Sequence, residues 1–152
     1  MKLRTLLLSL TLATAIFPVA CSKDKKTDDA DSATKQNVTA AAWKISAATA
    51  LGLDVMSQVP ACYLDNHISF RSDLTGTVDE KTVVCNPPTS GNFTWSFNND
   101  ETEISLTASL VPGGNNTFKI VSVSSTQLVI SQVTSATPAP FPVEIVVTLT
   151  HP

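Results

Sequence analysis

Cysteine is the residue type in this sequence with the widest choice of chemistry, because a thiol can carry a lipid, form a disulfide or bind a metal ion. The chain has three cysteines, Cys21, Cys62 and Cys85. In an oxidising compartment an odd number leaves at least one thiol without a partner in the same chain. The surroundings of each cysteine therefore have to indicate which of these chemistries applies to it.

Cys21 follows a segment typical of a secretion signal. Lys2 and Arg4 precede a largely apolar run over residues 6–20, which corresponds to the basic and apolar regions of a signal peptide. Fifteen helical residues cover about 22 Å, less than the roughly 30 Å hydrocarbon core of a bilayer. We therefore expect residues 1–20 to be a signal peptide and not a permanent transmembrane helix.

The residues Phe17-Pro18-Val19-Ala20-Cys21 resemble a bacterial lipobox, in which small residues precede a cysteine that is diacylated and exposed by cleavage. Two acyl chains anchor a protein stably, whereas one binds only marginally. Ser22 resembles the outer-membrane class of Gram-negative lipoproteins, since Asp at that position is typical of inner-membrane retention. We expect a lipid-anchored outer-membrane protein on the periplasmic face or the cell surface. Ordinary cleavage that leaves Cys21 as a free thiol is the alternative.

With Cys21 assigned to lipid, Cys62 and Cys85 remain and can pair under oxidising conditions. Their bridge would close a 24-residue segment and, in the chain-entropy description, stabilise the fold by about 3 kcal/mol. The alternative is a two-cysteine metal site, but no histidine or third cysteine stands at ligand spacing. We expect a disulfide, no metal and no cofactor.

The chain then divides into a tether and one domain. Residues 21–36 hold four Lys and four Asp, and after Cys21 nothing apolar larger than Ala, so they cannot bury enough surface to fold. We expect a flexible tether over residues 21–37 and a single domain over 38–152. The domain has four basic against nine acidic residues, which argues against a nucleic-acid-binding face. We expect a monomer.

The domain shows the period-two alternation of antiparallel strands with one buried face. The apolar runs are 93–97, 104–108, 118–123, 128–131 and 143–149. In the third run the apolar face shifts by one residue, which predicts a β-bulge near Ile120-Val121. Turn-forming residues follow at 98–101, 112–116 and 125–126, and prolines 138, 140 and 142 indicate a loop or sheet edge. The spacing of Leu53, Met56 and Val59 predicts a short helix within residues 47–59.

Consecutive hairpins in about 115 residues must hide the edges of their sheet, and closure achieves this. We therefore predict an all-β fold, an antiparallel up-and-down β-barrel of about eight strands with a short helical segment before Cys62. A β-sandwich is the alternative, because alternation alone does not show closure.

From Ala41 to His151 the sequence resembles the small lipocalin-like domain of Gram-negative envelope lipoproteins. The similarity lies in the order and spacing of several motifs: Trp43-Lys44-Ile45-Ser46, Pro60-Ala61-Cys62 with Asp65-Asn66, Phe70 and Gly76, then Cys85-Asn86-Pro87, Gly91 to Phe97 with Ile104, and residues 147–151. Ala41 replaces the glycine usual before the first motif. The resemblance implies an up-and-down barrel and a Cys62–Cys85 bridge, and it implies little about activity.

Five aromatic residues are candidates for lining a ligand cavity in this barrel, since such cavities are mainly apolar and aromatic: Trp43, Phe93, Trp95, Phe97 and Phe118. The alternative is that these rings fill the barrel completely. Tyr63 or Arg71 would add a polar contact at the mouth of a cavity.

Catalytic motifs are missing from the sequence, and His67 and His151 are its two histidines. We expect a non-enzymatic lipoprotein that binds a small hydrophobic ligand. The alternative is a structural or protein/glycan-interaction lipoprotein with a filled core.

Overall fold

The computed structural model describes residues 31–110, 114–134 and 141–152. The predicted signal peptide and Cys21 lie outside the described residues, as do Pro112, Pro138 and Pro140. No helix among the described residues is long and apolar enough to cross a membrane.

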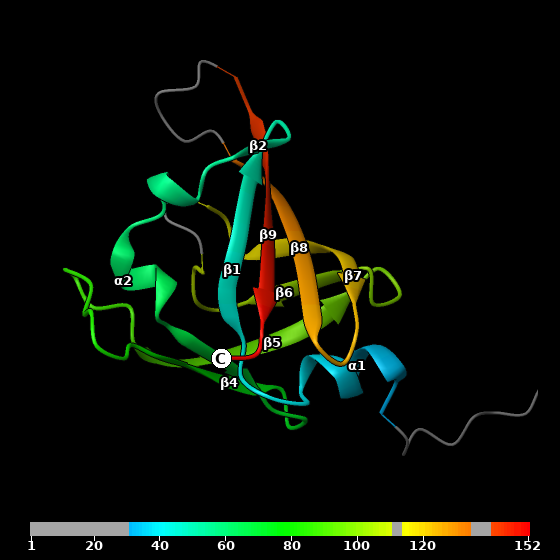
Figure 1. Ribbon diagram of the computed structural model, residues 1–152. Helices are drawn as coiled ribbons and strands as arrows, with labels where there is room; N and C mark the ends of the chain where they lie inside the picture. Colours follow the sequence, from blue (N-terminus) through cyan, green and yellow to red (C-terminus); the bar gives the residue numbers. More distant parts are fainter. Residues whose placement is uncertain (1–30, 111–113, 135–140) are drawn as a thin grey trace, which may run out of the picture.

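The domain is one nine-stranded antiparallel sheet with the strand order β2-β1-β9-β8-β7-β6-β5-β4-β3. Each strand from β3 to β9 pairs with the next, and β1 returns to pair with β9 (Figure 1). The strands are β1 Lys44–Ala50, β2 Leu53–Asp54, β3 His67–Phe70, β4 Thr75–Asp79, β5 Gly91–Asn98, β6 Glu103–Leu106, β7 Thr117–Val123, β8 Gln127–Thr134 and β9 Val143–Thr150. Three short helices accompany them, α1 Ala33–Val38, the 3₁₀-helix η1 Met56–Gln58 and α2 Ala61–Leu64. The predicted all-β, up-and-down antiparallel fold is confirmed.

The two ends of the sheet meet at a single isolated bridge. Trp43 N–H donates to the Ile68 carbonyl at 2.7 Å, and Ile68 N–H donates to the Trp43 carbonyl at 2.8 Å. Among the described strands no ladder joins β1 to β3, so this seam is the weakest part of the barrel wall. Residues 55–64, with η1 and α2, lie on this side of the molecule (Figure 1).

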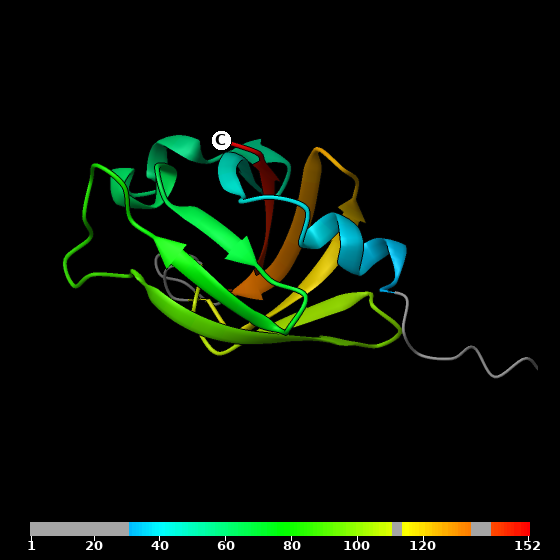
Figure 2. The ribbon, with the colours of Figure 1, turned by 90° about the horizontal axis from the view of Figure 1, so that it is seen from below.

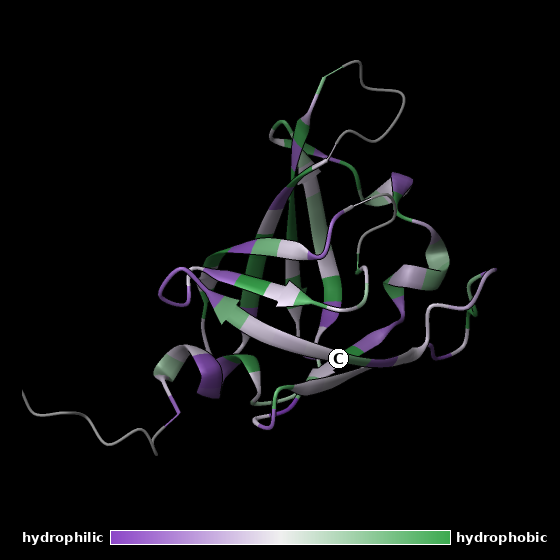
Figure 3. Cartoon of the chain, turned by 180° about the vertical axis from the view of Figure 1, so that it is seen from behind, coloured by the Kyte–Doolittle hydropathy of each residue, from purple (hydrophilic) through white to green (hydrophobic). Residues whose placement is uncertain are grey.

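The side-chain alternation places the core inside the barrel. In β5, Phe93 and Trp95 are buried while Asn92, Thr94 and Ser96 are exposed, and Figure 3 shows apolar and polar residues alternating along the strands. The β7–β8 register shifts between Ile120 and Ser122, which confirms the predicted bulge. A second bulge, between Ile45 and Ala47 on the β1–β9 pair, has no counterpart in the sequence pattern.

The β3–β4 hairpin was not predicted as a pair of strands. Its strands are short, and β4 contains Gly76, a residue that weakens a strand pattern. The structure shows why glycine stands there: a Cβ at position 76 would lie 2.2 Å from Phe93 Cζ and 2.7 Å from the Ser69 carbonyl oxygen. The Phe93 ring therefore covers the bare backbone of its neighbouring strand, and the pair stabilises the sheet by packing.

The short helical segment predicted within residues 47–59, before Cys62, is confirmed, but it occupies only the end of that range. Residues 47–50 continue β1, and Leu51 and Gly52 have positive φ angles, as a tight turn into β2 requires. The helical part is Met56–Gln58 alone, a 3₁₀ turn that ends before Pro60. The three-residue spacing of apolar residues arises here because a strand, a turn and a 3₁₀ turn follow one another. Periodicity alone does not distinguish this succession of short elements from one continuous helix.

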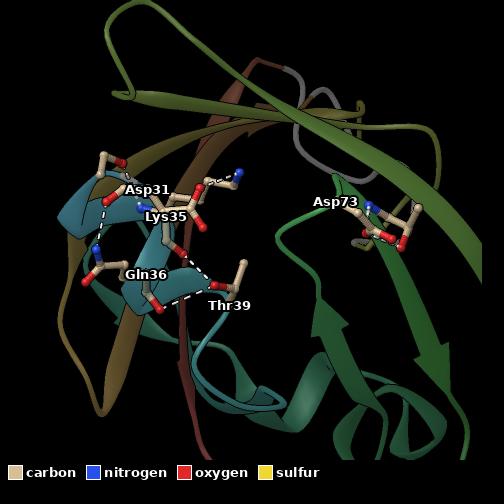
Figure 4. A network of polar contacts seen from close by, with 7 residues as sticks. Asp31, Lys35, Gln36, Thr39 and Asp73 are labelled. Atoms are coloured by element: carbon tan, nitrogen blue, oxygen red, sulfur yellow. Dashed lines mark hydrogen bonds and ion pairs between the residues drawn. The ribbon is translucent and has the colours of Figure 1, made fainter. Parts of the chain in front are cut away.

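The predicted tether extends too far, because residues 33–38 form α1. Ser32 caps this helix by accepting from Lys35 N–H at 3.0 Å, and Lys35 Nζ lies 2.8 Å from Asp31 Oδ1 (Figure 4). Val38 is fully buried, and its carbonyl accepts from the Trp43 indole N–H at 2.8 Å. A six-residue helix is not stable alone, and α1 is held by packing against β7 at this end of the barrel (Figure 2). The charged composition of residues 21–36 does not reveal that Val38, just after it, is buried and bonded to Trp43.

Candidate functional site

The five aromatic residues predicted to line a cavity instead occupy the core. Four are buried, with exposed fractions of 3% or less, and Phe97 is partly buried against them. Edge-to-face contacts join Phe70 to Phe93 at 5.4 Å, Phe70 to Trp95 at 5.5 Å and Trp95 to Phe97 at 5.1 Å between ring centroids. Both indole N–H groups donate to backbone carbonyls, Trp43 to Val38 and Trp95 to Thr75. Such satisfied, interlocked rings are typical of a filled core.

An apolar cavity that is partly open to solvent lies elsewhere among the described residues, between β1, β9 and residues 55–63. It has a volume of about 280 Å³, and none of the five predicted aromatic residues lines it. Its walls are aliphatic, and Gln58 and Tyr63 are the polar side chains among them. The lining residues are Ile45, Ala48, Ala50, Val55, Gln58, Val59, Pro60, Tyr63, Leu110, Ile145 and Val147.

The β1 bulge builds one wall of this cavity. Ile45 and Ala48 are three residues apart, and in a regular strand such residues point to opposite faces. The register shift between Ile45 and Ala47 brings both to the cavity, and Ala50 follows at the regular spacing. Ala48 and Ala50 carry only a methyl group, so this wall leaves space unfilled. Two inward-facing alanines on one strand are the sequence signal of this wall.

The opposite wall consists of residues 55–63, which carry η1 and are tied to the barrel at several points. Val55 N–H donates to the Ala48 carbonyl at 2.9 Å, and Met56 N–H donates to Asp54 Oδ1 at 2.8 Å. The Cys62–Cys85 disulfide, with a Cα–Cα distance of 5.1 Å, joins this segment to the 80–90 loop. The predicted bridge is therefore confirmed, and it lies next to the cavity wall.

A second, much smaller cavity of about 10 Å³ adjoins the first. Ile45, Tyr63 and Leu110 line both cavities. The small cavity is also lined by Asn66, which is 4% exposed and whose Oδ1 has no hydrogen-bond partner among the described residues. Tyr63, which we expected as a polar contact, is thus at the junction of the two cavities. Arg71 is not, since it borders an open surface depression beside Phe93.

Two carboxylates organise the loop that the disulfide holds. Asp65 Oδ2 accepts from Val83 N–H at 3.0 Å and Thr82 N–H at 2.8 Å, and these bonds lower the pKa of Asp65 below its ordinary value. Glu80 Oε1 accepts from the backbone N–H and hydroxyl of Thr89, each at 2.8 Å, and from Cys85 N–H at 3.1 Å. The Thr89 backbone bond is the main cause of the lowered pKa of Glu80.

The histidines do not take part in this site. His67 is not among the lining residues of either cavity. The His151 ring stacks on Trp43 at 4.3 Å, with Nδ1 2.9 Å from the Ala42 carbonyl and Nε2 2.8 Å from the Ser125 carbonyl. It therefore fixes the C-terminus to two other segments. Among the described residues no group of three side chains is arranged to hold a metal ion.

A one-domain, up-and-down antiparallel barrel with an apolar cavity at its wall has the architecture of lipocalin-type proteins. The family model for the lipocalin-like domain matches residues 25–130 of this chain. The chain belongs to the lipocalin-like family, in which a binding fold without catalysis is the general pattern. The match begins before α1 and ends within β8. No curated protein matches the chain.

Proposed function

We propose that this domain is a non-enzymatic binding module that holds a small apolar molecule in the cavity between β1, β9 and residues 55–63. The observation that carries the proposal is the aliphatic lining of this 280 Å³ space. Its volume lies just below the roughly 300–1,000 Å³ usual for ligand cavities. If each heavy atom takes the roughly 30 Å³ of a water molecule in the liquid, about nine heavy atoms fit. The ligand is therefore small.

A titration with benzene tests whether the cavity receives an apolar molecule. NMR methyl resonances of Ile45, Leu110 and Val147 are expected to shift, because these residues line the cavity. Ala48→Leu fills the same space and is expected to abolish the shifts. Thr49→Leu is the matched control, since Thr49 is the adjacent strand residue and does not line the cavity. Methyl shifts that are unchanged by benzene in the parent protein would contradict the proposal.

The second part of the proposal is that the domain is anchored through lipid on Cys21 to the outer membrane of a bacterial envelope. It is supported by the lipobox-like residues 17–21 and by the position of α1, which lies away from η1 and β2 (Figure 1). A tether leaving from α1 would keep the cavity wall clear of the anchor. The mass of the mature N-terminus and the membrane association of Cys21→Ala test it, and an unmodified thiol would refute it.

The filled aromatic core favours a second candidate, an interaction lipoprotein without a small ligand. In that case the exposed turn between β1 and β2, where Leu51 and Leu53 are 68% and 70% exposed, would contact a protein or glycan. Crosslinking on intact cells with a photoreactive residue at position 51 tests this candidate. A crosslinked partner together with unshifted methyl resonances in benzene would favour it over the first proposal.

A further inference from the structure

Asn66 is the buried polar side chain of the cavity system that the fold does not satisfy. Its Nδ2 donates to Thr89 Oγ1 at 3.2 Å, whereas its Oδ1 has no partner within residues 31–110, 114–134 and 141–152. A buried acceptor without a hydrogen bond destabilises the fold, because it has given up its bond to water and gained none in return. Such a group is rare in native folds and calls for an explanation.

The orientation of this amide is fixed by its neighbours. The Thr89 hydroxyl has one proton, which it donates to Glu80 Oε1 at 2.8 Å. Glu80 has no proton to donate in return, because its lowered pKa keeps the carboxylate ionised. Thr89 Oγ1 must therefore accept from Asn66, so the NH₂ group faces Thr89. The amide oxygen is left on the other side, and reversing the amide would place two acceptors together.

The space beside Asn66 has the size of one polar group. The small cavity that Asn66 lines measures about 10 Å³, close to the least volume that holds a water-sized group. It shares Ile45, Tyr63 and Leu110 with the aliphatic cavity. A hydroxyl or amide N–H at the end of an aliphatic molecule would therefore reach Asn66 while its tail occupies the larger space.

The charges around Asn66 determine which polar group is accepted. Asp65 carries a second buried oxygen, Oδ1, that has no partner in the part of the chain that the structure describes, and Glu80 is joined to Asn66 through Thr89. Lys44 is the basic residue that acts on Asp65. Two carboxylates and an amide oxygen near Asn66 disfavour a carboxylate ligand. No charged side chain is among the described lining residues of either cavity, so a buried ammonium would lose its hydration there without a direct ionic partner. A neutral donor remains.

From these observations we infer that the ligand is an aliphatic molecule of about nine heavy atoms that ends in a neutral hydrogen-bond donor, a hydroxyl or an amide, received by Asn66 Oδ1. This inference rests on the proposed function, because it requires the larger cavity to hold the apolar part.

Two isomers with nine heavy atoms test the inference, 1-octanol, which has a donor, and 1-methoxyheptane, which has none. Isothermal titration calorimetry on the protein is expected to give a Kd for 1-octanol about tenfold lower, as the loss of one buried hydrogen bond implies. Octanoate is expected to bind more weakly than either. Asn66→Leu is expected to equalise the two isomers, and the exposed Asn92→Leu is the control that should keep the difference.

The outcomes distinguish the inference about the polar end of the ligand from the proposed function, which is binding in the larger cavity. Equal affinities of the isomers for the parent protein, as expected if a trapped water satisfies Asn66, would overturn the inference and leave the proposed function in place. Octanoate binding as tightly as 1-octanol would overturn it as well. Failure of both isomers and of benzene to bind would refute the proposed function itself. The isomer comparison uses the parent protein, so it stands even if Asn66→Leu does not fold.

Discussion

Ala48→Leu is expected to stabilise the unliganded domain, although enlarging a buried residue usually does the opposite. Ala48 is 3% exposed and faces a cavity of about 280 Å³, which is more space than three additional carbons need. At about 0.8 kcal/mol per buried carbon the gain is about 2.4 kcal/mol, from which about 0.5–1 kcal/mol of lost side-chain entropy is subtracted. The free energy of unfolding should rise by about 1.5 kcal/mol.

Urea denaturation followed by the fluorescence of the buried Trp43 and Trp95 measures this change. The midpoint should move to higher urea without a change in slope, and the melting temperature should rise by about 5 °C. Thr49→Leu, on the outer face of the same strand, should change stability by less than about 0.5 kcal/mol. A loss of about 1–3 kcal/mol in Ala48→Leu, the usual cost of overpacking, would show that the space is filled and would refute the reasoning.

Three further predictions concern the parts that hold the cavity in place. Replacing Cys62 and Cys85 by serine removes a cross-link over 23 positions and should lower the free energy of unfolding by about 3 kcal/mol, measured by urea denaturation; an unchanged midpoint would contradict this. Gly76→Ala should cost about 1–3 kcal/mol, because its Cβ meets the Phe93 ring, and in a double-mutant cycle the loss should shrink in Phe93→Leu; equal losses in both backgrounds would refute the clash. Stability should also fall on acidification, because three carboxylates have folded-state pKa values below their unfolded ones, Asp65, Asp73 and Glu80. Their contribution is fully present above the unfolded pKa values near 4 and is lost as pH falls through the folded ones. Urea midpoints from pH 7 to pH 2 test this, and a midpoint that rises below pH 4 would refute it.

Much of the fold could be predicted because alternation reports directly which face of a strand is buried. The bulge near Ile120-Val121 was visible for that reason, as the apolar face changes sides within one run. The bulge in β1 was not visible, because Ala47 and Ala48 are alike and give no contrast between the two faces. The β3–β4 hairpin was not predicted, because a glycine such as Gly76 normally indicates a break in a strand. Here the glycine is needed to leave room for the Phe93 ring.

The candidate site was harder to predict for a different physical reason. Period-two alternation shows that Phe93 and Trp95 point inward, but it does not show whether the interior is full at their level. The aromatic rings do fill it, while the hollow lies where small residues such as Ala48 and Ala50 face an irregular segment. Whether a cavity is present depends on how completely all the surrounding side chains fill the space, and no single residue in the sequence indicates this. The unpaired acceptor of Asn66 follows from its contact with Thr89, which is 23 residues away in the sequence.

The seam between β1 and β3 has a consequence for rates. One pair of hydrogen bonds joins Trp43 to Ile68, whereas the β8–β9 ladder pairs eight residues of each strand. Separation at the seam therefore breaks little and leaves the remaining ladders intact, and local openings of low cost occur more frequently than global unfolding. When the seam opens, the Cys62–Cys85 disulfide still holds residues 55–63 to the 80–90 loop. We expect the walls of the cavity to set how tightly a ligand is held, and the seam to set how long it stays.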